Sequence, residues 1–159
     1  MQTIDALKSL VVNHPFLSGL NPHFYHLFGE CALRRPYGKG QEIFHEGGNA
    51  DHFYLIQSGK VALETFVPGR GMVTIQLLSP GEALGWSWLF APYRWQFDVR
   101  AIDPVGALSF DGACLRGKCA EDPALGYALL TLLAAVFVER LQETRLRLLD
   151  LYARVDGGG

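Results

Sequence analysis

The sequence has no excess of positive charge. Its 14 Lys and Arg residues are outnumbered by 16 Asp and Glu residues, which gives the 159-residue chain a net charge of −2. The basic residues are scattered, apart from Arg140, Arg145 and Arg147 near the end. A surface that binds nucleic acid needs a basic patch to replace the counterions of the phosphates. We therefore expect no direct contact with DNA or RNA.

Cysteine is scarce, and the N-terminus lacks the pattern of a secretory signal. The three cysteines, Cys31, Cys114 and Cys119, leave one thiol unpaired in any arrangement of disulfides, and no C-x-x-C pair is present. A sparse, odd set favours reduced thiols inside the cell over a disulfide framework or a metal site. The start of the chain has neither a long apolar core nor a cleavage site. These absences predict a cytoplasmic protein.

No apolar run is long enough for a membrane span. The most apolar stretch, residues 124–138, falls short of the ~20 residues that a span needs and continues into the charged segment ERLQETR. We expect a buried helix there and no membrane association. The composition, 49% hydrophobic and 19% charged, is that of a well-packed globular chain, and the length suits a single domain.

The residue pattern divides the chain into three parts. Residues 1–30 read as a helical lead-in, in which Asn21 is a helix cap and Pro22 takes the first helical position. From 31 to 110, short runs of β-branched and aromatic residues alternate with Gly and Pro turn signals. Residues 111–159 return to a helical pattern. The predicted fold class is α+β, mainly β, with the short strands in an antiparallel barrel, sandwich or jelly roll, short N-terminal helices and a long C-terminal helix.

The C-terminal helix carries an apolar stripe. Its members follow steps of three and four residues and are Ala134, Phe137, Leu141, Thr144, Leu148 and Leu151. A helix of ~30 residues that begins at Asp122–Pro123 would be about 45 Å long, which is more than a small roll can cover. The stripe therefore predicts a homodimer through this helix. Packing of the stripe on the roll of the same chain remains an alternative.

Three stretches give the chain a family resemblance. They are GKGQEIFHEGGNADHFYLIQSGKVAL, LLSPGEALGWSWLF followed by QFDVRAID, and ERLQETR. In this order they resemble the cyclic-nucleotide-binding domain of catabolite-activator-like (Crp/Fnr-type) regulators. The resemblance implies an antiparallel β-roll or jelly roll of about eight strands. It also implies a sensor or regulatory module in signal transduction, with a small-molecule ligand and a phosphate-binding loop at residues 79–100. Few residues follow Ala153, so we expect no DNA-binding domain, and any effect on genes would pass through a partner protein.

The predicted phosphate-binding loop matches the family in its backbone and departs from it in a side chain. The resemblance implies that backbone N–H groups and an Arg hold the cyclic phosphate, while a Glu accepts a hydrogen bond from the ribose. Gly81, Glu82, Leu84 and Gly85 match the family's turn. Trp86 stands in place of the ribose-binding Glu. An indole donates one N–H and cannot accept in the way a carboxylate does.

The phosphate-binding Arg also has no direct counterpart. Its position falls on Trp95 or, counted from the other end of a loop that is one residue short, on Gln96. Arg94 is one step from either register and is a candidate substitute. On the helix, Thr144 and Arg145 fall where the resemblance implies contacts with the base, and a bond from Thr144 to its own helix carbonyl is the alternative. We expect weak or no binding of cyclic AMP, and the sequence indicates no other cofactor.

Neither an enzyme nor a metal site is expected. The segment GWSWL lacks the closing Gly of a G-x-S-x-G nucleophile elbow, so Ser87 is predicted to cap a short helical turn or to donate to a ligand. His23 and His26 are three residues apart, but no Cys, Asp or Glu lies at a matching metal-binding spacing.

Two functions remain open. The first is a small-ligand sensor, and the second is a ligand-free interaction module whose pocket is filled by its own indoles. They differ in whether Trp86, Trp88 and Trp95 point into the pocket or away from it. We expect Trp86 or Trp95 to close the pocket in part, and the remaining space to suit a flatter, less anionic molecule than a cyclic nucleotide.

Overall fold

The N-terminal part of the chain is helical. The computed structural model describes residues 4–157. Its first elements are α1 (Ile4–Asn13), the 3-10 turns η1 (Pro15–Leu17) and η2 (Pro22–Phe24), and α2 (Tyr25–Cys31). The side chain of Asn21 caps η2 by accepting a hydrogen bond from the backbone N–H of His23 at 3.2 Å, and Pro22 takes the first position. The short N-terminal helices expected from the sequence are confirmed.

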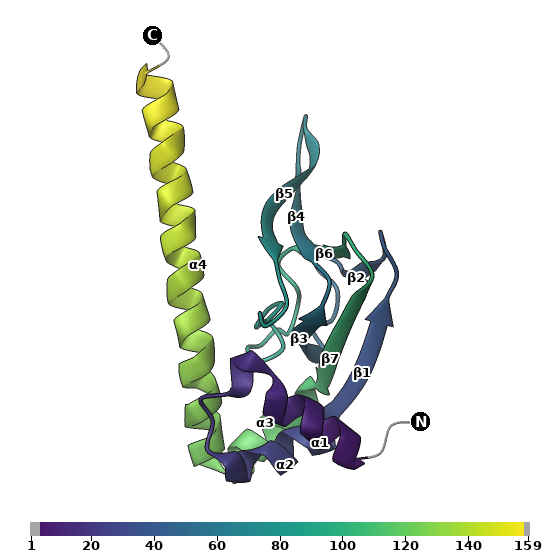
Figure 1. The fold of residues 1–159 in the computed structure, drawn as a ribbon. Coiled ribbons are helices and arrows are strands. Elements are labelled where there is room, and N and C mark those ends of the chain that lie inside the picture. Colours follow the sequence, from purple (N-terminus) through teal and green to yellow (C-terminus); the bar gives the residue numbers. More distant parts are fainter. Residues whose placement is uncertain (1–3, 158–159) are drawn as a thin grey trace.

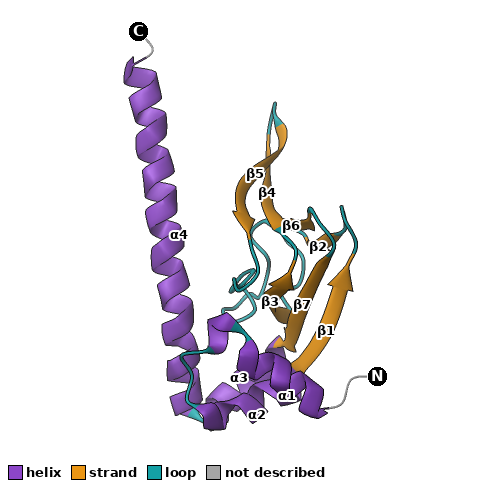
Figure 2. Ribbon diagram, viewed as in Figure 1, coloured by secondary structure: helices purple, strands orange, loops and turns teal. Residues whose placement is uncertain are grey.

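Two antiparallel sheets, with seven strands among residues 4–157, form the β-roll (Figure 2). One sheet has the order β1–β7–β3, with bounds Ala32–Tyr37, Val105–Asp111 and His52–Ser58. The other has the order β2–β6–β4–β5, with bounds Glu42–Phe44, Asp98–Ala101, Val61–Val67 and Gly71–Leu78. The predicted mainly-β roll is confirmed. Its strand count is one lower than expected because the long segment between β5 and β6 contributes only isolated bridges, Leu55–Ala83 and Asn49–Arg94.

Strand β3 lies at the centre of the core. Its residues from Phe53 to Ile56 are all buried, which means that both faces of the strand are covered. On one face, Phe53 contacts Phe16 of the helical lead-in with ring centroids 5.8 Å apart. On the other, Tyr54 stacks with Phe44 of β2 at 6.0 Å. The lead-in and the two sheets therefore share one hydrophobic core around β3.

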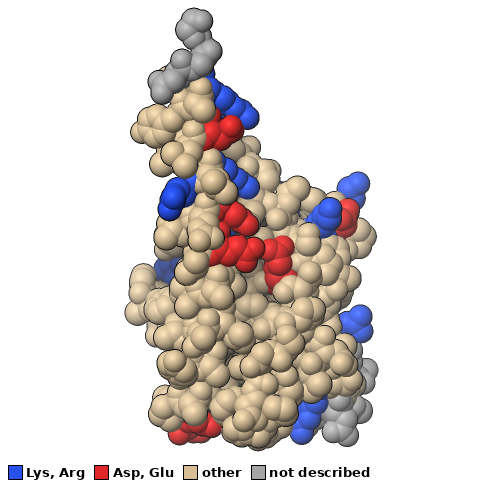
Figure 3. Space-filling model, turned by 60° about the vertical axis from the view of Figure 1, so that its left-hand side comes forward, with Lys and Arg blue, Asp and Glu red and all other residues tan. Residues whose placement is uncertain are grey.

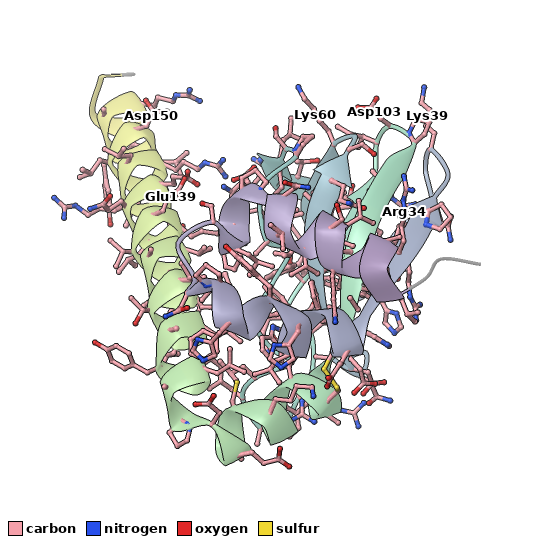
Figure 4. All side chains as sticks on the ribbon, turned by 60° about the horizontal axis from the view of Figure 1, so that its bottom comes forward. Arg34, Lys39, Lys60, Asp103, Glu139 and Asp150 are labelled. Atoms are coloured by element: carbon pink, nitrogen blue, oxygen red, sulfur yellow. A yellow bond between two sulfur atoms is a disulfide. The ribbon has the colours of Figure 1, made fainter. Side chains whose placement is uncertain are left out.

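A disulfide joins Cys31 to Cys114, with Cα atoms 5.8 Å apart, and is visible as the yellow bond in Figure 4. The prediction of reduced thiols is therefore wrong for these two residues, while Cys119 is free. The pairing follows from the sheet, because Ala32 of β1 lies opposite Phe110 of β7. The residue before β1 and the first turn of the helix after β7 thus meet, although 83 positions separate them in the sequence.

Two helices complete the chain: α3 (Gly112–Glu121) and α4 (Pro123–Gly157). The carboxylate of Asp111 caps α3 by accepting from Cys114 N–H at 2.8 Å. Helix α4 is 35 residues long and stands beside the roll (Figure 1). Its buried side chains, Leu125, Leu129 and Leu133, recur every four residues and pack on the domain. From residue 144 to 155 every side chain is exposed, so this half of the helix has no cover within the described chain.

The exposed part of α4 is largely apolar. In Figure 3, which brings the side of the molecule that carries α4 forward, charged side chains gather in the upper half of the view and a wide uncharged area covers most of the lower half. By length and composition, Pro123–Val155 would suffice to cross a membrane, and only 17% of its most apolar window is buried. A core helix would be covered by its own fold, whereas this face is left open. The predicted absence of membrane association stays a prediction.

His14 links the helical lead-in to the start of the candidate binding loop. The side chain is 4% exposed. Its Nδ1 accepts from Phe16 N–H at 3.2 Å, so in the neutral ring Nε2 carries the proton and donates to the carbonyl of Ile56 at 2.8 Å. The same carbonyl accepts from Gly81 N–H at 2.9 Å. Burial lowers the pKa of His14, and the backbone hydrogen bond to Ile56 opposes that shift only in part.

We expect acid to destabilise the chain through His14. Because burial holds the folded-state pKa of His14 below the usual value of 6.5, the unfolded chain binds the proton more readily. The stabilisation is complete above about pH 6.5 and is lost as the pH falls below it. Urea unfolding at pH 7.5 and pH 5.5 measures this loss, which should shrink in His14→Gln. An equal loss in both proteins would contradict the assignment to His14.

Candidate ligand-binding site

The first part of the loop at residues 79–100 is bonded to β3. Gly81, with φ of +95°, makes the turn that a side chain would strain. After it, Ile56 N–H donates to the carbonyl of Glu82 at 3.0 Å, and Leu84 N–H donates to the carbonyl of Tyr54 at 3.1 Å. Because the N–H groups of Gly81 and Leu84 both bond to β3, neither is free to hold an anion. These two donors of the predicted phosphate cradle are thus used by the fold.

The carboxylate of Glu82 is also engaged within the turn. Its Oε2 accepts from Ser79 N–H at 2.7 Å, two residues before the turn glycine. This local bond has the geometry of a cap, in which a carboxylate satisfies an otherwise free backbone donor. Glu82 therefore closes its own turn and does not extend toward a ligand.

Two indoles fill the interior side of the loop. Trp95 is 3% exposed and stacks on Phe44, with ring centroids 3.8 Å apart and an interplanar angle of 10°. Gly85 makes room for it, since a Cβ there would lie 2.9 Å from Trp95 Cζ3. Trp88 is fully buried and stacks on Phe53 at 5.0 Å. Both rings belong to the hydrophobic core.

Residues 86–90 form one hydrogen-bonded turn, in which Leu89 N–H donates to the carbonyl of Trp86 at 3.0 Å. The helical turn expected after Gly85 is thus no more than this, and half-buried Ser87 lies within it. Arg116 of α3 fixes the loop from outside by donating to the carbonyl of Trp88 and stacking over Tyr93 at 4.1 Å.

Trp86 behaves differently from the other two indoles. Its ring meets Phe137 of α4 edge-on, with centroids 4.8 Å apart. The guanidinium of Arg140, one turn along α4, lies over the same ring at 5.3 Å. Trp86 thus faces α4 rather than the interior of the roll, and it forms part of a cavity between the two.

Only part of the Arg140 guanidinium is hydrogen-bonded. Its Nη2 donates to the carbonyl of Ala83 at 2.6 Å, whereas Nη1 is buried without a partner among the described residues. Burial lowers the pKa of the guanidinium, and the nearby carboxylates of Glu82, Glu143 and Glu139 oppose that shift. Arg140 is not among the site residues predicted from the sequence. The available signal was its position four residues before Thr144, which places both on one helix face.

A cavity of about 530 Å³ lies between the β4–β5 hairpin, the loop and α4. Its walls are mostly apolar and aromatic, with one charged side chain. They are formed by Leu63, Ile75, Gln76, Trp86, Phe90, Phe97, Phe137, Arg140, Leu141 and Thr144. Two of the residues predicted from the sequence, Trp86 and Thr144, therefore meet at this cavity.

The other predicted polar residues lie elsewhere. Arg94 is exposed and donates to Asn49 Oδ1, so its guanidinium is held at the turn between β2 and β3. Gln96 is exposed and donates to the carbonyl of Arg94 at 3.2 Å. Arg145 is exposed and is not part of the cavity wall. Thr144 donates to the carbonyl of Arg140 at 2.8 Å, which is the intrahelical bond considered as the alternative.

No group of three or more His, Cys, Asp or Glu side chains within residues 4–157 is placed to hold a metal ion. The site is therefore described by its cavity, its aromatic walls and one guanidinium.

The β-roll, the loop and the flanking helices agree with a known family. A model of the cyclic nucleotide-binding domain matches residues 34–122, more than half of the chain. The chain belongs to the cyclic nucleotide-binding domain family. The matched residues of this cyclic nucleotide-binding domain include the loop at 79–100 but end before the part of α4 that lines the cavity.

Curated relatives of the domain are named as regulators. The CRP-like cAMP-activated global transcriptional regulator of Mycobacterium tuberculosis (strain ATCC 25618 / H37Rv) is 31% identical over 113 residues, which cover 71% of this chain and 49% of the regulator. The Cyclic AMP receptor protein of Thermus thermophilus is 38% identical over 71 residues, which cover 45% of this chain and 33% of that protein. The chain spans half or less of the length of these relatives.

Solved structures share the fold of this cyclic nucleotide-binding domain. A putative cyclic nucleotide-binding protein from Geobacter metallireducens is 28% identical with a TM-score of 0.72, and the match covers 89% of this chain and 99% of that one. A cyclic nucleotide-binding domain from Methylobacillus flagellatus has a TM-score of 0.77 at 18% identity, covering 92% and 83%. The second likeness concerns the fold alone.

Proposed function

We propose that the chain is a sensor domain that binds a small, flat and largely apolar molecule in the cavity between the β-roll and α4. The observation that carries the proposal is the cavity itself, with Trp86 and Phe137 on its walls and Arg140 as its one charged residue. Its volume of about 530 Å³ lies in the range of small-molecule sites. Binding there would join the roll to α4 and so change the position of a helix that is otherwise half uncovered.

Cyclic AMP is a poor match for this site. The resemblance implies an Arg fork for the phosphate and a Glu for the ribose, and Trp95 and Trp86 stand at those positions. Each charge-assisted contact is worth roughly 1.5–3 kcal/mol. Losing both removes about two to four powers of ten in affinity. The engaged N–H groups of Gly81 and Leu84 offer no compensation for this loss.

Calorimetry with cyclic AMP should therefore give a dissociation constant in the millimolar range or weaker. The affinity should be unchanged in Arg94→Ala, since that guanidinium is bonded to Asn49 on a turn outside the cavity. Micromolar binding that disappears in Arg94→Ala would refute the prediction, because Arg94 would then replace the missing phosphate ligand after a shift of the loop.

We also propose that the chain is a homodimer through α4. The stripe predicted from the sequence packs on the loop at Phe137, but its members Leu141, Leu148 and Leu151 are 71%, 52% and 57% exposed, which leaves this part of the stripe open to a partner helix. Tyr127 and Val155 extend it at the seven-residue spacing of a coiled-coil seam. Because Leu141 and Thr144 line the cavity as well, a partner helix would help to enclose the ligand.

The second candidate is an interaction module that needs no ligand. The burial of Trp88 and Trp95 favours it, because these rings fill part of the interior of the roll. The open cavity beside Trp86 favours the sensor instead. In either case the module is regulatory and acts through a partner protein, and its cytoplasmic location and its lack of contact with nucleic acid stay predictions from the sequence.

A further inference from the structure

The guanidinium of Arg140 is fixed in place by one of its nitrogens, while another has no hydrogen-bond partner in the described part of the chain. Nη2 is fixed on the carbonyl of Ala83 at 2.6 Å, and the ring of Trp86 covers the group at 5.3 Å. Nη1 is buried and has no acceptor within the described chain. A buried donor without an acceptor costs free energy that an incoming oxygen atom would recover. The side chain of Arg140 also lines the cavity, and a ligand bound there lies beside the guanidinium.

No carboxylate of the described chain forms an ion pair with Arg140 within 4 Å. The carboxylates of Glu82, Glu143 and Glu139 lie near enough to act on its charge. Two of them are engaged in other hydrogen bonds: Glu82 accepts from Ser79 N–H at 2.7 Å, and Glu143 accepts from Gln76 Nε2 at 2.6 Å. Arg140 is thus a positive charge in an apolar wall without a direct ion pair to the described residues, and a ligand carboxylate in contact with it would supply one.

The aromatic side chains of the cavity favour an anion with a flat ring. Trp86 and Phe137 meet edge-on, and Phe90 lies 6.4 Å from Phe137, which surrounds the space with aromatic rings. Such rings bind another ring by stacked or edge-to-face contact. Because Nη2 already donates to Ala83, Nη1 is the donor left for a ligand, and it suits a single carboxylate. The sugar of a nucleotide would bring hydroxyl groups that these apolar side chains cannot satisfy.

From these contacts we infer that the cavity takes a planar aromatic monocarboxylate, with its carboxylate on Arg140 and its ring against Trp86 and Phe137. This inference rests on the proposed function and narrows the ligand to one chemical class. The sequence predicts a ligand that is less anionic than a cyclic nucleotide. The ligand inferred here keeps one negative charge, which is bound by α4 instead of the phosphate loop. Recognition then depends on the loop and the helix together.

A series of probes with one ring system and different charge tests the inference. Indole-3-acetate, indole-3-acetamide and tryptamine carry a carboxylate, a neutral amide and an ammonium group on the same ring. Calorimetry on the full chain should show the acid binding roughly ten- to a hundredfold more tightly than the amide, as expected for one charge-assisted bond. Tryptamine should bind most weakly, because its ammonium would face a guanidinium.

Variants separate the role of Arg140 from general ring binding. In Arg140→Gln the affinity for the acid should fall to that for the amide, whereas in the exposed control Arg94→Gln it should not change. If Arg140→Gln does not fold, the comparison of acid with amide in the unaltered chain decides the question alone. An amide that binds as tightly as the acid overturns the inference and leaves the sensor proposal standing. If neither the three probes nor neutral indole bind at millimolar concentration, both fail.

Discussion

Leu141→Asp is expected to convert the chain from a dimer into a monomer. Leu141 is 71% exposed in the single chain and lies at the centre of the apolar stripe on α4. A carboxylate at a helix–helix seam would be buried without a partner, which costs several kcal/mol and is repeated on the second helix. Light scattering at micromolar concentration should give twice 17.6 kDa for the unaltered chain and 17.6 kDa for the variant.

The control is the same substitution five residues along the same helix. Leu146 is 65% exposed, but five residues correspond to about 500° of rotation, which places it on another side of α4. Leu146→Asp should therefore stay dimeric. A monomeric unaltered chain would remove the basis of the homodimer proposal. Equal dissociation by both substitutions would place the interface on a broader surface than the stripe.

Trp95→Arg is expected to unfold or severely destabilise the chain, although it would place an arginine at one of the positions where the family resemblance implies one. Trp95 is 3% exposed and stacks on Phe44 at 3.8 Å. Removing such a ring costs about 3–5 kcal/mol as an alanine substitution. A guanidinium at the same place adds the cost of a charge in the core. Urea unfolding should therefore show a larger loss for Trp95→Arg than for Trp95→Ala.

Trp86 is the matched control, since it is an indole of the same loop that lies at the cavity wall and is half-buried. Trp86→Ala should cost only about 1–2 kcal/mol of unfolding free energy. Similar losses for Trp86→Ala and Trp95→Ala would contradict the assignment of one ring to the cavity and the other to the core. A stable Trp95→Arg variant that binds cyclic AMP tightly would show that the interior can still accept a phosphate.

Local patterns in the sequence were sufficient to predict the strands and helices. The turn glycines and the short β-branched runs from 31 to 110 predict strands because side-chain alternation and positive φ are properties of a few neighbouring residues. The 3.6-residue period of apolar side chains likewise predicted α4, including its start at Asp122–Pro123. The segment at residues 81–85 was identified through the family resemblance, and its role in binding stays a prediction. These features need no knowledge of the rest of the chain.

The long-range contacts were beyond such patterns. Cys31 and Cys114 meet because β1 and β7 pair in one register, with Ala32 opposite Phe110. A spacing of 83 residues carries no sign of that register. The prediction from an odd cysteine count therefore missed the disulfide.

Composition and periodicity determined the mainly-β middle of the chain and the long C-terminal helix, and the family resemblance added the β-roll and the loop at residues 79–100. Only the tertiary structure decided which indole lies in the core and which lines the cavity. The segment before Trp86 bonds to β3 through Ile56 and Tyr54, whereas the backbone of Trp95 bonds to Gly47 and Gly48. The tertiary structure also decided that Arg140 faces Trp86, since the rotation of α4 about its axis is set by where Leu125, Leu129 and Leu133 pack. A one-dimensional pattern specifies the faces of a helix but not the neighbour that each face meets.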